Sequence, residues 1–186
     1  ILAALVLVDL WTIDKRYLNG SHFVTKKEFK GNFAKRPVDD MILEDIDPHY
    51  RVLDLSVNTF NDSYVSYHHK TIGGYSPVKL QRYQDLIEKY LTSEINEIYG
   101  IINDSETIQD IEDNLPELAI TSLLNGKYII LGGDYPPIFN RFAKGNAWFV
   151  DSAVAAANPD EEIALIEAVD LGRTAVIGDD FAWARK

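Results

Sequence analysis

The sequence contains no cysteine. This absence excludes disulfide bonds, thiolate zinc sites and a cysteine nucleophile together. It does not decide the compartment, because cytosolic proteins and exported bacterial domains can both do without thiols. The chain has 186 residues, of which 46% are apolar and 25% charged, and these values are ordinary for one globular domain. We therefore expect a folded chain rather than a disordered one.

Positive charge is also scarce. The chain has 18 Lys and Arg residues against 29 Asp and Glu, which gives a formal net charge of −11. A field of that sign repels phosphate backbones, and no stripe dense in Lys and Arg offsets it locally. Nucleic acid is therefore not an expected partner. Binding flat on an anionic membrane surface is not expected either, because that mode needs basic residues.

Long apolar runs are lacking as well. The opening run, Ile1–Val8, has eight residues before Asp9 interrupts it, whereas a transmembrane helix needs about 20. Two interpretations are open: an ordinary buried strand or helix start, or the end of a transmembrane helix. The second fits the residues that follow, whose types gather at membrane interfaces: Trp11, Lys15, Arg16 and Tyr17.

The common glycine-rich and hydrolase motifs do not occur. The pairs Gly73-Gly74 and Gly132-Gly133 belong neither to Gly-x-Gly-x-x-Gly nor to a P-loop, so they indicate no phosphate cradle. Gly-x-Ser-x-Gly, the nucleophile elbow of many hydrolases, is missing too. No cofactor is indicated.

Histidines and carboxylates give no metal motif. His68 and His69 are neighbours, and neighbouring side chains on an extended segment point to opposite sides, so we expect no metal site there. The carboxylates of Asp39–Asp47 lack the order of a calcium-binding loop. We expect them to form a solvated acidic face.

Short apolar strands alternate with amphipathic helices, which predicts the α/β class. We expect one layered domain over residues 1–186, with a small mixed or parallel sheet flanked by helices. The alternating or apolar runs predict strands at 50–56, 127–131, 147–150 and 174–177. Helical spacing and capping residues predict helices at 39–47, 76–91, 95–102, 106–113, 116–124 and 159–171.

The loop 58–75 is the best ligand candidate in the sequence. It combines aromatic rings with imidazoles, amides and hydroxyls, a mixture that suits sugars or other polar small molecules. The alternative is that its tyrosines are half-buried and brace a long loop. The candidate ligand-binding residues are Tyr64, Tyr67, His68, His69, Gly73, Gly74 and Tyr75.

Several segments together resemble the YfhO-type bacterial membrane proteins. The resemblance runs from Leu5 to Val150, and its most specific parts are Ile72–Tyr75 and Arg82–Asp85. The segments that carry it are Asp9–Trp11, Lys15–Leu18, Tyr50–Val52, Ser66–Tyr75, Lys79–Asp85, Leu123–Ile130 and Gly145–Val150.

Members of that family are many-span membrane proteins similar to glycosyltransferases of the cell envelope that use lipid-phosphate sugars. The resemblance implies that this chain is a soluble extracytoplasmic domain that follows a late transmembrane helix of a bacterial membrane protein. Its partners would be the transmembrane part of the same polypeptide and a glycan acceptor or lipid-linked sugar. The family's presumed catalytic residues lie in other loops, so none can be assigned to this chain.

Two functions follow from these expectations. The first is an accessory domain of a membrane glycosyltransferase that contacts the glycan or lipid-linked sugar. The alternative is a non-catalytic structural or protein-interaction module. A stand-alone hydrolase ranks third, because no nucleophile–base motif is apparent.

Overall fold

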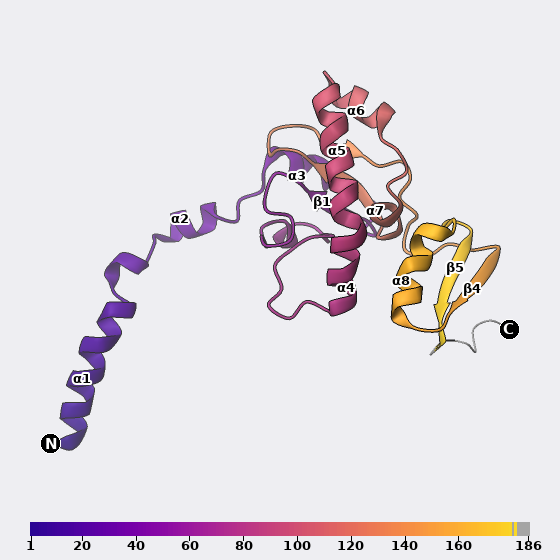
Figure 1. Cartoon of the computed structure of the whole chain (residues 1–186). Helices are drawn as coiled ribbons and strands as arrows, with labels where there is room; N and C mark the ends of the chain where they lie inside the picture. Colours follow the sequence, from indigo (N-terminus) through magenta and orange to yellow (C-terminus); the bar gives the residue numbers. More distant parts are fainter. Residues whose placement is uncertain (180, 182–186) are drawn as a thin grey trace. The chain divides into compact units, whose positions relative to one another are not determined.

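The computed structural model describes residues 1–179 and 181, and it confirms the α/β class (Figure 1). The chain divides into two compact units, Ile1–Ala34 and Lys35–Lys186, and each is described by itself. The expectation of one domain over residues 1–186 stays a prediction.

The first unit is helical. Helix α1 spans Leu2–Tyr17, a 3₁₀ turn η1 spans Gly20–His22, and α2 spans Lys26–Gly31. The opening apolar run therefore starts a helix, so the strand interpretation is wrong. Burial of this run is wrong as well, because every side chain of α1 is exposed.

The second unit contains a three-stranded mixed sheet. Its strands are β1 (Arg51–Asp54), β2 (Gly126–Ile130) and β3 (Ile138–Phe139), in the order β1-β2-β3. β1 runs parallel to β2, and β3 pairs with β2 in antiparallel fashion. Consecutive residues, which point to opposite faces, are fully buried in both strands, as expected for strands covered on both faces: Val52 and Leu53 in β1, and Ile129 and Ile130 in β2.

A long helical stretch follows the loop 58–75. It comprises α4 (Gln81–Leu86), a π-helical turn η3 (Ile87–Leu91) and α5 (Thr92–Asp104). The predicted start at Ser76-Pro77 is wrong, because the residue before α4, Leu80, is still extended at φ −63° and ψ 134°. The first turn of α4 is fixed by a tertiary contact instead, since the Tyr83 hydroxyl donates to the carbonyl of Ile72.

Three further helices complete this part of the unit: α3 (Pro37–Ile42), α6 (Ile108–Asn114) and α7 (Ala119–Leu123). α7 begins after the predicted Pro116. Backbone amides in its first turn donate to the carboxylate of Glu94 on α5. The nitrogen of Ile120 lies 2.6 Å from Glu94 Oε1. A cap from a distant helix cannot be recognised in the local sequence. The predicted end is confirmed, because Asn125 has φ 58°.

The second unit also contains a two-stranded parallel sheet, and α8 (Pro159–Ala168) connects its two strands. Its strands are β4 (Ser152–Ala156) and β5 (Thr174–Gly178). The predicted start of α8 at Pro159 is confirmed, and Asn158 caps the helix by accepting from the amide of Glu161 at 2.9 Å. The predicted strand 147–150 is wrong, because pairing with β5 begins at Ser152. Alanine-rich β4 has weak strand propensity, so its identity depends on that pairing.

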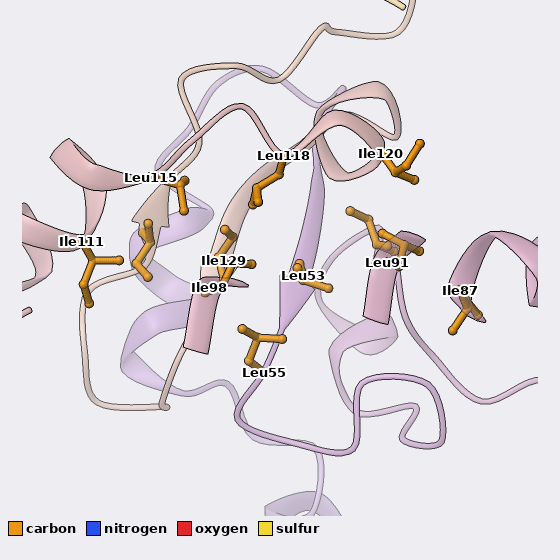
Figure 2. Close-up of a cluster of buried hydrophobic side chains, with 12 residues drawn as sticks. Leu53, Leu55, Ile87, Leu91, Ile98, Ile111, Leu115, Leu118, Ile120 and Ile129 are labelled. Atoms are coloured by element: carbon orange, nitrogen blue, oxygen red, sulfur yellow. The ribbon is translucent and has the colours of Figure 1, made fainter. Parts of the chain in front are cut away.

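The main core lies between β1, β2 and the helices, as Figure 2 shows. A smaller buried cluster adjoins it and supports the segment around α3. Its members are Val38, Ile42, Tyr50, Val52, Val65 and Ile130.

Candidate functional site

A buried charged network lies where β1 ends. Arg36 precedes α3, Asp39 lies in the first turn of α3, and Asp54 is the last residue of β1. The guanidinium donates to Asp39 through Nε and Nη2, both at 3.0 Å. Nη2 also donates to Asp54 Oδ2 at 2.8 Å, and Nη1 donates to Ser56 Oγ at 2.9 Å. Carboxyl ends of parallel strands are frequent ligand sites in α/β proteins.

The charges of Arg36 and Asp39 are held in their ionised forms. The side chains of Asp39 and Asp54 are 0% and 2% exposed. Burial alone would raise the pKa of Asp39, but hydrogen bonds from Arg36 outweigh it and leave that pKa lowered. Burial opposes the charge of Arg36 too, yet the two carboxylates raise its pKa. The expected solvated acidic face is therefore wrong at Asp39.

His69 joins this network from the loop 58–75. Its Nε2 lies 3.2 Å from Asp39 Oδ1, and its side chain is fully buried. Burial lowers the pKa of His69, and the attraction of Asp39 only partly offsets this effect. The imidazole is therefore neutral at pH 7, and the contact is a hydrogen bond rather than an ion pair. Because a carboxylate can only accept, Nε2 carries the proton and Nδ1 is an acceptor.

Tyr64 and His68 cover the same region. The ring of Tyr64 lies over the guanidinium carbon of Arg36 at 4.8 Å, a cation–π contact. The rings of Tyr64 and His68 meet edge to face at 5.7 Å, and the rings of His68 and His69 are 6.4 Å apart. Three of the predicted site residues are therefore brought together.

The other predicted residues lie elsewhere. Tyr67 and Tyr75 are exposed. A Cβ at Gly73 would overlap the carbonyl of Thr59, and Gly74 has φ 108°, so both glycines serve the path of the backbone. These observations place the two glycines in packed backbone and leave the two tyrosines exposed.

The two histidines do not point to opposite sides, as an extended segment would require. The 3₁₀ turn η2 (Val65–Tyr67) precedes them, and His68 has helical angles of φ −118° and ψ −31°. Both residues line one cavity of about 270 Å³, although the side chain of His69 is itself fully buried. Across residues 1–179 and 181, no group of three or more His, Asp and Glu side chains is arranged to hold a metal ion.

The cavity lies between segments 43–50 and 68–70. Its charged groups are already paired. Asp45 accepts from Lys127 and from the Tyr128 hydroxyl, contacts that lower its pKa to about 2. The ammonium of Lys70 donates to the carbonyl of Pro48 at 2.9 Å.

A larger hollow of about 450 Å³ lies beside β5. Its lining is mainly apolar and includes Trp148, Val150 and Val176. Ligand sites combine apolar walls with a few convergent polar groups. The smaller cavity beside the histidines meets that description better.

Arg36, Asp39 and Asp54 were missed as site residues from the sequence. The local signal was weak, because Arg36 and Asp39 flank an ordinary helix start at Pro37. Asp54 is 18 residues from Arg36 in the sequence, and His69 is 30 residues from Asp39. Only the fold brings these side chains together.

Comparison with known proteins finds no matching family model, no matching curated protein and no matching solved structure. The resemblance to the YfhO-type proteins stays a prediction.

Proposed function

We propose that this chain is a membrane-attached extracytoplasmic domain, accessory to a multi-span bacterial membrane protein that resembles cell-envelope glycosyltransferases. In this role it contacts the transmembrane part of the same polypeptide and a glycan or lipid-linked sugar. The observation that carries the proposal is helix α1, whose apolar side chains are exposed on every side.

The first half of α1 has no polar face. Leu5, Val6, Leu7 and Val8 together cover one full helical turn, and their exposed fractions lie between 49% and 68%. A helix that is apolar all round is normally buried in protein or in lipid. The first unit buries no residue of α1, so lipid is the environment that we propose.

The second half of α1 has the composition of a membrane interface. The ammonium of Lys15 lies 5.2 Å from the ring of Trp11, and Tyr17 is exposed. Such aromatic and basic residues anchor helices at the level of the lipid headgroups. No helix within residues 1–179 and 181 is both long and apolar enough to cross a membrane. At 16 residues, α1 is about 24 Å long.

Vesicle flotation of the full chain tests the attachment. We expect the chain to float with phosphatidylcholine vesicles, and the double variant Leu5→Asp/Val8→Asp to stay at the bottom of the gradient. The matched control is Val78→Asp/Leu80→Asp, which places the same charges on exposed apolar residues of the second unit. Flotation that is absent in the wild type, or equal in all three proteins, would contradict the proposal.

A non-catalytic structural or interaction module is the second candidate, and the packed part of the loop favours it. Ile72 is buried, Gly73 abuts Thr59, and the amide of Gly74 donates to the carbonyl of Thr59 at 2.7 Å. This candidate predicts that the purified chain binds no sugar, whereas the first predicts that it does.

A further inference from the structure

A guanidinium without a carboxylate partner lies at the start of β1. Nη1 of Arg51 donates to the carbonyl of Leu124 at 2.7 Å. Arg36, Arg82 and Arg173 each pair with a carboxylate. Arg51 has no such pair within the part of the chain that the structure describes. A guanidinium stays charged and has five N–H donors, so most donors of Arg51 remain for another partner.

This guanidinium lies at a cavity of about 280 Å³. The start of β1, the loop 58–75, α4 and the end of α7 meet there, and the lining residues are Arg51, Thr71, Ile72, Gly73, Tyr83 and Leu124. Burial raises the pKa of the Tyr83 hydroxyl, and the charge of Arg51 partly offsets that rise. The positive charge is therefore close to the phenol on the cavity wall. Because Arg51 is exposed, its donors are accessible to a ligand.

The lining of this cavity carries one positive charge and no negative charge. Its ionised residue is Arg51. By contrast, Glu162 lines the hollow beside β5, and Asp45 and Asp47 line the cavity beside the histidines. An anion therefore meets attraction at Arg51, whereas carboxylates would repel it in the other two hollows.

The hydroxyl groups of the wall are already used. The hydroxyl of Tyr83 donates to the carbonyl of Ile72. The hydroxyl of Thr71 donates to the carbonyl of Val52 at 3.2 Å. The donors that remain for a ligand therefore belong to Arg51. Pockets for small molecules combine such a polar group with apolar or aromatic walls, and the half-buried Tyr83 supplies an aromatic wall here.

We propose that this cavity binds a small ligand through one oxyanion group, a carboxylate or a phosphate, which accepts hydrogen bonds from the guanidinium of Arg51. The planar fork of a guanidinium matches both groups with two parallel hydrogen bonds. Pockets for drug-sized ligands begin at roughly 300 Å³. At about 280 Å³, this cavity has room for a single ring that carries the anion. The site goes beyond the proposed function and does not depend on it.

Amide NMR titration of the full chain tests the site. The probes are benzoate, phenyl phosphate and benzamide, the last being an uncharged molecule of nearly the same shape as benzoate. We expect at least one anion to shift the amide signals of Arg51, Gly73 and Tyr83 to saturation, and benzamide to leave them unchanged. The anion that binds more tightly identifies the preferred oxyanion. High salt should weaken its binding, because salt screens the charge of an exposed group.

Three variants locate the binding. Arg51→Gln removes the charge and should weaken binding of the preferred anion about 10-fold, the effect of a hydrogen bond to a charged group. Arg51→Lys keeps the charge but loses the fork, so its affinity should be intermediate. The matched control is Arg141→Gln, because Arg141 is also exposed but does not line this cavity. It should bind as the wild type does. The backbone amide spectrum of each variant establishes that the fold is retained.

The proposal is overturned if neither anion shifts these signals, if benzamide binds as tightly as benzoate, or if both variants of Arg51 keep wild-type affinity. None of the probes is a sugar and none of the variants changes α1. The anion site and the proposed function can therefore fail separately.

Discussion

Helix α1 and the network of Arg36, Asp39 and His69 differ in which kind of side chain they expose and which kind they bury. α1 exposes a full turn of aliphatic residues, whereas the network buries a guanidinium, a carboxylate and an imidazole. Exposed apolar surface costs free energy in water unless another apolar phase covers it. Buried charge costs free energy unless a partner compensates it. The exposed surface of the first region is what the proposed contact with lipid accounts for, whereas the second region is stabilised by contacts inside its own unit.

The largest effect expected from this comparison is at Arg36. Arg36→Ala leaves Asp39 and Asp54 buried without their cation, and breaking such a pair costs about 3–5 kcal/mol. Urea unfolding measures this loss. The matched control is Lys35→Ala, because Lys35 pairs with Asp40 at 3.4 Å on the surface. That exposed pair contributes about 0–1 kcal/mol. Equal losses in the two variants would contradict the account of the network.

A pair of leucine truncations compares core and surface directly. Leu53→Ala removes a fully buried side chain and should cost about 2–5 kcal/mol in the free energy of unfolding. Leu5→Ala removes an exposed side chain and should change it by less than about 0.5 kcal/mol in the absence of lipid. A large loss at Leu5 in plain buffer would show that α1 is packed against protein.

A smaller effect is expected from pH. The pKa of His69 is lower in the folded chain than its ordinary 6.5, so the unfolded chain binds more protons between these two values. The contribution of His69 to stability is therefore complete above pH 6.5 and is lost as the pH falls toward the folded pKa. Thermal unfolding between pH 7 and 5 measures the slope.

His69→Gln should flatten this pH dependence, whereas His49→Ala should keep it. A slope that is unchanged in His69→Gln would mean that another group titrates.

The smallest effect is expected at Tyr64. Tyr64→Leu removes the ring over Arg36 and should cost about 0.5–1 kcal/mol. Tyr75→Leu, at an exposed site in the same loop, should stay within about 0.5 kcal/mol. Equal unfolding midpoints for the two variants in urea would contradict a stabilising role for the cation–π contact.

Local signals predicted those parts of the fold whose causes lie within a few residues. Helix α8 starts at Pro159 as expected, and the apolar run after Gly126 forms β2. The failures have distant causes. The start of α7 depends on Glu94, and β4 is a strand because it pairs with β5.

In the candidate site, too, the sequence predicts only what depends on neighbouring residues. Tyr64, His68 and His69 were found because their ring types cluster in one loop. The sequence predicts a solvated Asp39, because nothing near this residue in the sequence shows that Arg36 and His69 enclose it. The partners of a buried charge come from different elements, so they become visible only in the fold.

The absence of cysteine makes the central claim, the contact between α1 and lipid, directly measurable. One cysteine introduced by Leu7→Cys can carry a nitroxide spin label at a unique position, with Val78→Cys as the control in the second unit. On addition of vesicles, the account predicts that the label at position 7 becomes more accessible to oxygen and less accessible to a water-soluble nickel complex. The label at position 78 should not change. Equal accessibility at both positions, with and without vesicles, would contradict the account.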